Sequence, residues 1–186
     1  MKKQYIKNLC IIAVLLTFLI GCNTATNPGG NDVQDIKIYF SPADNCDVQI
    51  VNLINNAKSE LNIAVYSFNR PNIADAVIQA YERGVAVRVV FDESQLTGPN
   101  SKQTYLQDAG VPVRKDKPGS AAYSQMHNKF AIIDKRIVIT GSYNWTTNAT
   151  TNNDENMLVI TSPDTAAAYN TEFEKIWAHA TDLTSG

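Results

Sequence analysis

The alternation of short β-type runs with helical patterns is the feature that most constrains the fold of this chain. Apolar and β-branched residues cluster in runs at residues 36–40, 61–68, 85–91, 111–114, 126–133, 136–140 and 157–160. Between these runs, apolar residues recur at helical spacing in residues 48–57, 71–81 and 101–109, and again from residue 163 onwards. This order predicts an α/β fold, with a mixed sheet sandwiched between helices on both faces.

Residues 36–183 have the length of one domain. Pro71 stands where a helix can begin, and Gly84 stands where that helix can end. The run at residues 85–91 is continuously apolar and is typical of a strand that is buried on both faces. The turn pair Asp134-Lys135 separates two further runs and predicts that they pair as neighbouring strands.

The first 21 residues have the features of an export signal. Lys2, Lys3 and Lys7 precede an apolar run at residues 9–20, which is too short to span a bilayer comfortably. The run ends in Leu19-Ile20-Gly21-Cys22, which resembles a bacterial lipobox. This resemblance implies cleavage before Cys22 and a lipid on its thiol, and thus a cell-envelope protein anchored to a membrane, the outer one where the cell has one. A plain transmembrane anchor, or a cleaved signal with an incidental cysteine, remains an alternative.

Residues 22–35 are polar and lack an apolar period, so we expect a flexible tether between the lipidated cysteine and the domain. Cys10 leaves with the signal, and Cys22 is the lipidation site. Cys46 then has no partner for an intrachain disulfide. We expect Cys46 to be a small buried residue, and a disulfide that bridges a dimer is the alternative.

The charge balance argues against a generally nucleic-acid-binding surface. Loss of the three N-terminal lysines leaves 13 basic and 18 acidic residues, a formal charge of −5. An acidic chain attracts a polyanion only through a local basic patch. Arg114, Lys115 and Lys117 are candidates for such a patch, although a solvated loop would have the same composition.

A cluster of polar residues follows the run at residues 126–133. His127 and Lys129 are two residues apart, so a strand would place both side chains on one face. Ser142 and Asn144 lie just after the next run, where a loop can direct them into a cleft. An imidazole, an ammonium, a hydroxyl and a carboxamide that converge on one point suit a phosphodiester. No His/Asp cluster has the spacing of metal ligands, and no cofactor is expected.

The spacing H-x-K-x(4)-D-x(6)-G-S-x-N in residues 127–144 resembles the signature of the phospholipase D superfamily. The opening run at residues 38–42 and the acidic segment Asp154-Glu155-Asn156 resemble further motifs of that superfamily. The whole domain is similar to its small bacterial nucleases, which carry one such motif. The resemblance implies a phospholipase D-like fold and a phosphodiester hydrolase that needs no metal.

The resemblance also implies roles for individual residues. His127 corresponds to the catalytic nucleophile that forms a phosphohistidine, and Lys129 and Asn144 correspond to phosphate ligands. Ser142 corresponds to the hydroxyl beside the phosphate, and catalytic Glu155 to the acid that hydrogen-bonds the nucleophilic imidazole.

Asp134 is the aspartate of the motif, and the resemblance places it among the catalytic residues. It stands at the predicted turn, where aspartate is favoured, so we expect its contribution to be more structural than chemical. Tyr143 and Trp145 are candidates either for stacking on bases or for packing within the loop. His179 lies at the end of the last predicted helix, where a cationic imidazole suits the helix dipole.

Three functions are compatible with these residues: a nuclease for DNA or RNA, a phospholipase D that acts on membrane lipids, and an inactive binding module. Retention of both His127 and Lys129 argues against the third. A covalent mechanism needs one imidazole as nucleophile and another as general acid, and the chain has one motif histidine. We therefore expect a homodimer in which two copies of His127 share one site.

Overall fold

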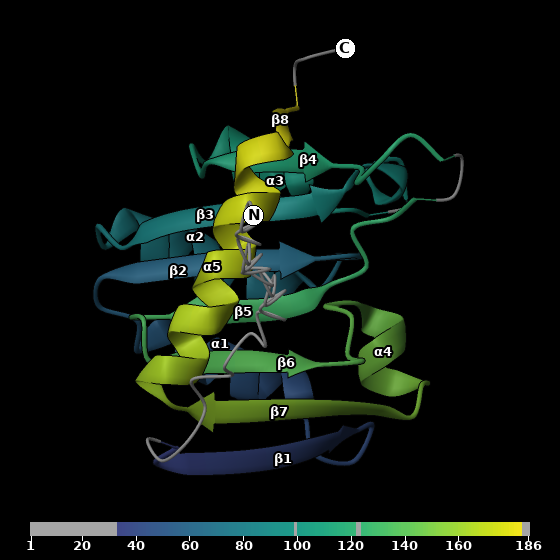
Figure 1. The fold of residues 1–186 in the computed structure, drawn as a ribbon. Helices are drawn as coiled ribbons and strands as arrows, with labels where there is room; N and C mark the ends of the chain where they lie inside the picture. Colours follow the sequence, from purple (N-terminus) through teal and green to yellow (C-terminus); the bar gives the residue numbers. More distant parts are fainter. Residues whose placement is uncertain (1–32, 99, 122–123, 184–186) are drawn as a thin grey trace, which may run out of the picture.

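An eight-stranded mixed sheet runs through the computed structural model, which describes residues 33–98, 100–121 and 124–183. The strand order across the sheet is β1-β7-β6-β5-β2-β3-β4-β8 (Figure 1). In chain order the strands are β1 (Asp35–Ser41), β2 (Glu60–Val65), β3 (Ala86–Asp92), β4 (Val113–Asp116), β5 (Lys129–Ile133), β6 (Ile137–Gly141), β7 (Glu155–Thr161) and β8 (Thr181–Asp182).

Helices cover both faces of this sheet, which confirms the predicted sandwich. Helices α1 (Cys46–Asn55), α2 (Pro71–Glu82) and α3 (Gln103–Asp108) lie on one face, and the long helix α5 (Pro163–His179) crosses the other (Figure 1). The short helix α4 (Thr147–Thr151) lies beyond the end of β6, and a 3-10 turn, η1 (Glu93–Gln95), follows β3.

The connections explain which strands are parallel. Helices α2 and α3 carry the chain back across the sheet, so β2, β3 and β4 are parallel neighbours. A tight turn joins β5 to β6 in an antiparallel hairpin, and its two central residues, Asp134 and Lys135, have φ values of 52° and 54°. Positive φ at both central residues is typical of the hairpin turns whose twist matches that of the flanking strands.

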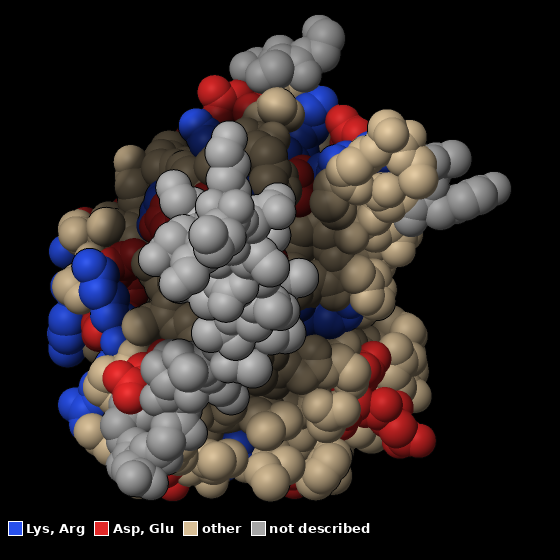
Figure 2. Space-filling model, viewed as in Figure 1, with Lys and Arg blue, Asp and Glu red and all other residues tan. Residues whose placement is uncertain are grey.

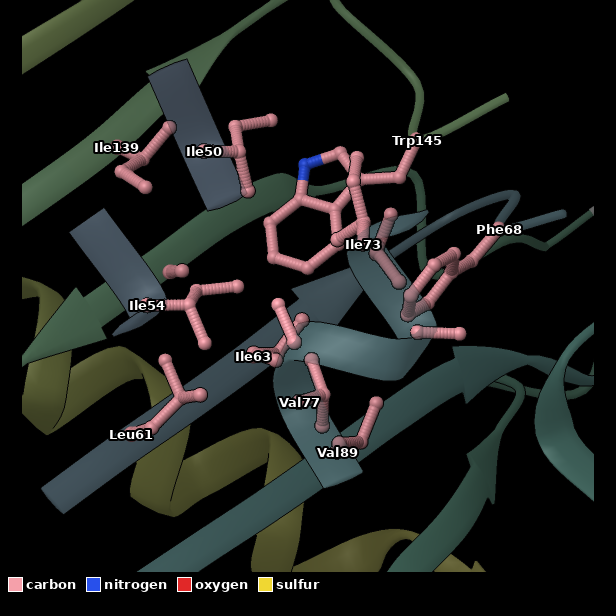
Figure 3. Close-up of a cluster of buried hydrophobic side chains, with 14 of the residues drawn as sticks. Ile50, Ile54, Leu61, Ile63, Phe68, Ile73, Val77, Val89, Ile139 and Trp145 are labelled. Atoms are coloured by element: carbon pink, nitrogen blue, oxygen red, sulfur yellow. The ribbon is translucent and has the colours of Figure 1, made fainter. Parts of the chain in front are cut away.

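The core has two layers, one on each face of the sheet. Figure 3 shows the larger one, where apolar residues of α1 and α2 pack on inward-facing residues of the central strands, including Ile50, Ile54, Ile63, Val77 and Val89. The second layer lies beneath α5, where Phe173 and Ile176 pack on Phe130 and Ile132. Strand β2 is buried on both faces, as expected for a strand at the centre of such a sandwich.

Several predicted boundaries were wrong by a few residues. The run at residues 126–133 forms a strand only from Lys129, and the run at residues 61–68 ends as a strand at Val65. These two strands pair with each other, and their last pair is Val65 with Lys129, so β2 ends and β5 begins there. Strand β1 begins at Asp35, one residue inside the predicted tether. Helix α4 and strand β8 had no apolar period that would have predicted them.

The export signal, Cys22 and most of the predicted tether lie outside the described residues. Within the described part of the chain, no helix is long and apolar enough to cross a membrane. Cys46, at the start of α1, is fully buried and carries a free thiol, as predicted for a small core residue. Its burial excludes it from the surface of this chain, so it is not placed to bridge two copies.

Candidate active site

The polar residues of the motif come together at one edge of the sheet because of the strand register. Lys129, the first residue of β5, is paired with Val65, the last residue of β2. Glu155, the first residue of β7, is paired with Ser41, the last residue of β1. Strand β6 ends at the same edge with Gly141. The starts of β5 and β7 and the ends of β1, β2 and β6 therefore lie together at this edge, with the loops that join them.

A pocket of about 410 Å³ opens at this edge. It is lined by His127, Lys129, Gly141, Ser142, Asn144 and Glu155. The structure thus brings together five of the six predicted site residues of the motif. His127 and Lys129 both line this pocket, although only Lys129 belongs to a strand, so the strand geometry expected for the pair is not what brings them together.

Gly141 is required by the close approach of two strands. Its φ is +146°, and an added Cβ would lie 2.2 Å from the backbone oxygen of Asn156 on β7. The same oxygen accepts hydrogen bonds from the backbone N–H groups of Ser142 (3.1 Å) and Tyr143 (3.3 Å). The absent side chain therefore lets the loop after β6 fold tightly over the start of β7, and this places Ser142 and Asn144 at the pocket.

Ser142 and Glu155 form a hydrogen-bonded pair in the pocket wall. The Ser142 hydroxyl donates to Oε2 of Glu155 (2.5 Å) and accepts from the backbone N–H of Asn156 (3.1 Å). The other carboxylate oxygen of Glu155 accepts from the side chain of Asn153 (2.9 Å). Both side chains thus have fixed orientations, so the serine hydroxyl is held in place by the chain itself.

Asn144 has a constrained backbone and a side chain with an unused polar atom. The next residue, Trp145, is bonded to the loop after β2. Its backbone N–H donates to the carbonyl oxygen of Ser67, and its own carbonyl oxygen accepts from the backbone N–H groups of Asn69 and Arg70. The side-chain oxygen of Asn144 is buried and has no hydrogen-bond partner among the described residues. A buried amide without a partner is costly and recurs at functional sites, so this group is available to a ligand.

His127 is exposed at the pocket, and its imidazole has no hydrogen-bond partner within the described residues. The hydrogen bond from Glu155 that the resemblance implied is not formed within one chain, because Glu155 is bonded to Ser142 and Asn153. Partial burial lowers the pKa of His127 below its usual 6.5, the positive charge of Lys129 lowers it further, and Asp92 opposes them. The imidazole is therefore biased towards its neutral, nucleophilic form.

Lys129 is almost fully buried, and its ammonium has two close neighbours. It donates to the backbone oxygen of His127 (2.7 Å) and lies 4.8 Å from the ring centroid of Tyr66. Burial lowers its pKa from the usual 10.5, while the negative charges of Glu155 and Asp92 act in the opposite direction. An ammonium has three donors, so Lys129 retains donors for a ligand in the pocket.

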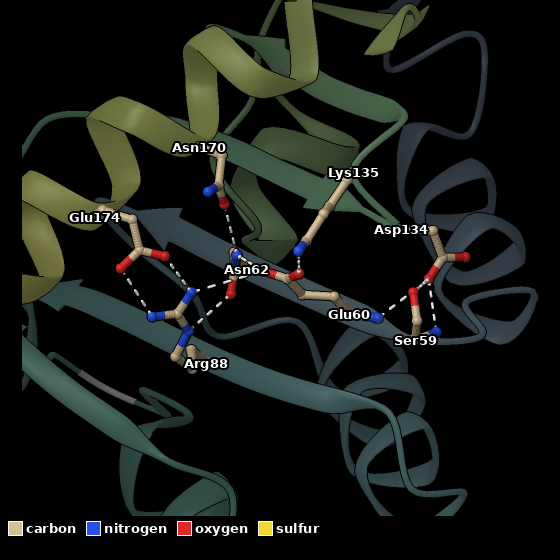
Figure 4. Close-up of polar contacts among 8 residues, drawn as sticks. All are labelled: Ser59, Glu60, Asn62, Arg88, Asp134, Lys135, Asn170 and Glu174. Atoms are coloured by element: carbon tan, nitrogen blue, oxygen red, sulfur yellow. Dashed lines mark hydrogen bonds and ion pairs between the residues drawn. The ribbon is translucent and has the colours of Figure 1, made fainter.

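Asp134 is the motif residue that the structure does not bring to the pocket. It follows the far end of β5, about 17 Å from Lys129 at the usual rise per strand residue. Its carboxylate accepts hydrogen bonds from the backbone N–H groups of Ser59 and Glu60 and from the Ser59 hydroxyl (Figure 4). It also accepts one from the backbone N–H of Lys58. These contacts tie the β5–β6 turn to the start of β2, which is a structural role.

Two aromatic residues of the motif loop pack inside the protein. Tyr143 is 2% exposed and its hydroxyl is 2.6 Å from that of Thr150, while Trp145 is 1% exposed and packs edge-on against Phe68. Of the two interpretations, the packing role is confirmed for both rings, and neither offers a face to a base.

The basic residues near the end of β4 are engaged with other groups. Arg114 bonds to Asp182 and to the backbone oxygen of Trp177, and Lys115 pairs with Glu93. Neither lines the pocket. On the face seen in Figure 2, Lys and Arg side chains stand in small groups beside Asp and Glu and form no continuous basic surface.

His179 also lies away from the pocket. It is the last residue of α5, and its Nδ1 is 2.8 Å from the buried carboxylate of Asp116. Its side-chain contact is therefore with the end of β4 and not with the pocket residues.

Two residues of the site escaped the sequence analysis, Tyr66 and Asp92. Each lies where a parallel strand ends at the pocket edge, and Tyr66 contacts both His127 and Lys129. The only sequence signal was their position at the end of apolar runs, where polar groups meet at one edge of a parallel sheet. No group of three His, Cys, Asp or Glu side chains that could hold a metal ion exists within the described residues.

Comparisons with known proteins agree with the motif. The family model described as "Cardiolipin synthase, PLD-like domain" matches residues 50–177. A mitochondrial cardiolipin hydrolase of Chlamydomonas reinhardtii is 34% identical over 84% of this chain and 67% of its own length. A phospholipase D of Rickettsia conorii is 40% identical over 72% of this chain and 65% of its own length.

A solved structure has a similar fold and a similar size. The phospholipase D family member Nuc from Salmonella typhimurium superimposes with a TM-score of 0.74 and 32% sequence identity, covering 81% of this chain and 99% of that one. The curated relatives are longer, and the chain spans about half to two thirds of the length of the cardiolipin hydrolases that it matches.

Proposed function

Because this chain belongs to the phospholipase D superfamily, we propose that it is a phosphodiesterase that cleaves nucleic acid through a phosphohistidine on His127. The observation that carries the proposal is the convergence of His127, Lys129, Ser142 and Asn144 on one open pocket. A phosphodiester has charged phosphoryl oxygens and an electrophilic phosphorus. The pocket offers an imidazole nucleophile beside an ammonium and two neutral polar groups, which suits both features.

The reaction has two displacements at phosphorus. In the first, a nitrogen of the His127 imidazole attacks phosphorus and the bond to the leaving oxygen breaks. In the second, water attacks the phosphohistidine and releases the imidazole. The lowered pKa of His127 supports the first step, because the attacking imidazole must be neutral. Lys129 and Asn144 bind the phosphoryl oxygens, with Ser142 beside them.

Proton balance requires a second acid–base group. The leaving oxygen must gain a proton, and the attacking water must later lose one. His127 is the only histidine among the described residues that line the pocket. We therefore propose a homodimer in which a two-fold axis brings two copies of His127, Lys129, Asn144 and Glu155 into one shared site. The lack of a bond between His127 and Glu155 within one chain supports a role for the second copy.

The shape and lining of the pocket support a nucleic-acid substrate. Within the described residues, no aliphatic side chain lines it, so the acyl chains of a lipid would find no apolar wall there. The polar pocket is open to solvent, as a long polyanion requires. The superposition on 99% of the length of Nuc also supports a small phospholipase D family enzyme of similar size.

A phospholipid substrate is the second candidate function. It is supported by relatives whose names are cardiolipin hydrolase and phospholipase D, at 34% and 40% identity. Hydrolysis of a phosphatidyl ester proceeds through the same phosphohistidine, so the residues above would have the same roles. A lipid on Cys22 would hold the domain at a membrane that contains such substrates.

The test is a direct comparison of substrates with the purified protein. Nicking of plasmid DNA and cleavage of single-stranded DNA and RNA are measured beside choline release from phosphatidylcholine and phosphatidic acid release from cardiolipin. We expect nucleic-acid cleavage that is lost in His127→Asn. Lipid cleavage alone would replace the proposed substrate with the second candidate. No cleavage of any phosphodiester would contradict the enzymatic function.

The shared site is tested by mixing two differently tagged chains. Purified heterodimers of wild-type and His127→Asn chains should be nearly inactive, because one imidazole remains for two roles. Wild-type turnover by a verified monomer, or by that heterodimer, would show that a single His127 suffices and would exclude the shared site.

We also propose that the chain is exported to the cell envelope and anchored to a membrane through a lipid on Cys22. Support comes from the apolar run that ends in Leu19-Ile20-Gly21-Cys22. A stable anchor needs more than one acyl chain, so the mature protein should carry two or three. Mass spectrometry of the mature N-terminus should find an acylated Cys22, and an unmodified cysteine or another cleavage site would contradict the anchor.

A further inference from the structure

Tyr66 is the aromatic residue that contacts both proposed reactive groups. Its ring centroid is 4.5 Å from that of the His127 imidazole, with the two planes tilted by 56°. The ammonium of Lys129 lies 4.8 Å from the same ring centroid. These contacts place an imidazole and an ammonium, two residues apart, against one aromatic surface. A cation near an aromatic ring is attracted by the ring quadrupole.

The ring is held in place from several directions. The backbone N–H of Tyr66 donates to the carbonyl oxygen of Asn128 (2.8 Å), which continues the pairing of β2 with β5 by one residue. Its hydroxyl accepts hydrogen bonds from the side chains of Gln95 (2.9 Å) and Gln125 (3.2 Å). Tyr66 is half-buried, and its ring is held by these hydrogen bonds at its hydroxyl and backbone while it contacts His127 and Lys129.

Asp92 anchors the same segment from β3. It is 1% exposed, and its Oδ2 accepts a hydrogen bond from the backbone N–H of Met126 (2.7 Å). Its other oxygen accepts from the backbone N–H of Ser94 (3.0 Å). The residues on either side of His127 are therefore tied to the ends of β2 and β3, while the imidazole itself has no hydrogen-bond partner among the described residues.

We infer that Tyr66 is a positioning residue, whose ring fixes the direction of the His127 imidazole and of the Lys129 ammonium towards the pocket. An imidazole without a hydrogen bond can rotate about its side-chain torsions, and contact with the Tyr66 ring restricts that rotation. In-line attack on phosphorus depends on this direction, since small misplacements of a reacting group slow a reaction strongly. The consequence for turnover rests on the proposed function, whereas the effect on the imidazole does not.

The ring also contributes to the electrostatic setting of His127. Lys129 on β5, Asp92 on β3 and Glu155 on β7 are the charged groups around the imidazole. Burial is the largest cause of the lowered pKa of His127, and the Tyr66 ring supplies part of that burial. Attraction between the ring and a cationic imidazole acts in the opposite direction, but burial is the largest cause of the lowered pKa. Replacing the ring with water should therefore raise the pKa of His127 towards its usual value.

The first experiment is an NMR titration of the two imidazoles in the full chain, without substrate. His127 and His179 are the only histidines, and a His179→Gln variant assigns their signals. We expect Tyr66→Ala to raise the pKa of His127 and leave that of His179 unchanged. Tyr66→Phe keeps the ring and should restore the wild-type titration of His127. An unchanged His127 titration in a folded Tyr66→Ala protein would overturn the inference.

The second experiment compares turnover with a matched control. Tyr169 on α5 is also half-buried, packs edge-on against Phe130 and bonds to Thr140, but it has no contact with the pocket. We expect Tyr66→Ala to lower kcat about 10- to 100-fold, because the His127 nucleophile and the Lys129 ammonium are both misdirected. KM should change less than kcat, because Ser142 and Asn144 keep their positions at the pocket. Tyr169→Ala should lose similar thermal stability and keep its kcat.

These outcomes distinguish a failure of the role of Tyr66 from a failure of the proposed function. Equal losses of kcat in Tyr66→Ala and Tyr169→Ala would mean that the Tyr66 ring acts only on stability, and this would overturn the inference. If the wild-type protein cleaves no phosphodiester, the proposed function fails, and the titration still decides whether Tyr66 controls the imidazole. Wild-type kcat in a folded Tyr66→Ala protein would also overturn the inference that Tyr66 is a positioning residue.

Discussion

The two ends of β5 carry residues of one motif in contrasting environments. At the first end, the imidazole of His127 has no hydrogen-bond partner within the described residues, and the nearby amide oxygen of Asn144 is buried without one. At the other end, the carboxylate of Asp134 is surrounded by backbone and side-chain donors of residues 58–60. Unused polar groups mark the end that is available for chemistry, and satisfied groups mark the end that holds the sheet together.

Figure 4 shows that the second end belongs to a larger polar network. Lys135 pairs with Glu60, and the buried Asn62 connects Glu60 to Asn170 on α5. Arg88 joins the network through Asn62 and a two-pronged contact with Glu174. Polar groups here are satisfied by each other across the sheet and α5, so this end contributes to a unique register of the strands.

The substitution His127→Asn should give the largest difference between the two ends of β5, with a large loss of activity and little loss of stability. The exposed imidazole has no hydrogen bond to lose, so the melting temperature should stay close to that of the wild type. Activity should fall by at least about 10⁴-fold, because a covalent mechanism has no substitute for its nucleophile. Melting curves and phosphodiester cleavage are measured on the same sample. Substantial remaining activity would mean that another group is the nucleophile.

Asp134→Ala should have the opposite pattern. The backbone N–H groups of Lys58, Ser59 and Glu60 would lose their acceptor, at a cost of about 1–3 kcal/mol in the free energy of unfolding. Turnover per folded molecule should remain within about threefold of the wild type, since the residue is far from the pocket. Urea unfolding and active-site titration would test both. A large loss of turnover in the folded variant would assign Asp134 a catalytic role.

The contribution of Asp134 should also depend on pH. Burial would raise the pKa of Asp134, but the hydrogen bonds from Ser59, Glu60 and Lys58 outweigh it and hold the pKa below 3.8. A carboxylate with a lowered folded-state pKa stabilises the protein above its unfolded-state pKa, and this stabilisation is lost as the pH falls through the folded-state pKa. The stability difference between the wild type and Asp134→Ala should therefore shrink below about pH 4.

Lys129→Met tests the electrostatic coupling at the catalytic end. The positive charge of Lys129 opposes protonation of the imidazole, so its removal should raise the pKa of His127. The pKa of His179, which pairs with Asp116 elsewhere, should not change. NMR titration of the two imidazoles gives both values in one experiment. A fall in the pKa of His127 would mean that Lys129 acts on it mainly through something other than charge.

Treatment with a chelator should have the smallest effect. The pocket offers Lys129, Ser142 and Asn144 for charge on the phosphoryl group, so activity should be unchanged within error in EDTA. Cleavage is measured before and after dialysis against EDTA, with Mg²⁺ added back to a parallel sample. Loss of activity in EDTA and recovery with Mg²⁺ would contradict the phosphohistidine mechanism.

The sequence by itself determined the α/β class, the order of the main elements and most of the pocket. Apolar periodicity reports which face of a segment is buried, and local spacing reports which side chains share a face. These two local properties were enough to place His127 beside Lys129, with Ser142 and Asn144 in the following loop.

Only the tertiary structure decided which partners the motif residues have. The turn signal at Asp134 already predicted a structural contribution, but no local pattern shows that its carboxylate binds the backbone at the start of β2, about a strand's length from the pocket at Lys129. Tyr66 and Asp92 lie at the site because β2 and β3 end beside the segment that carries His127. Tyr143 and Trp145 are buried because the loop after β6 packs against the core. These contacts join residues far apart in sequence, and the register of the sheet determines which of these residues meet.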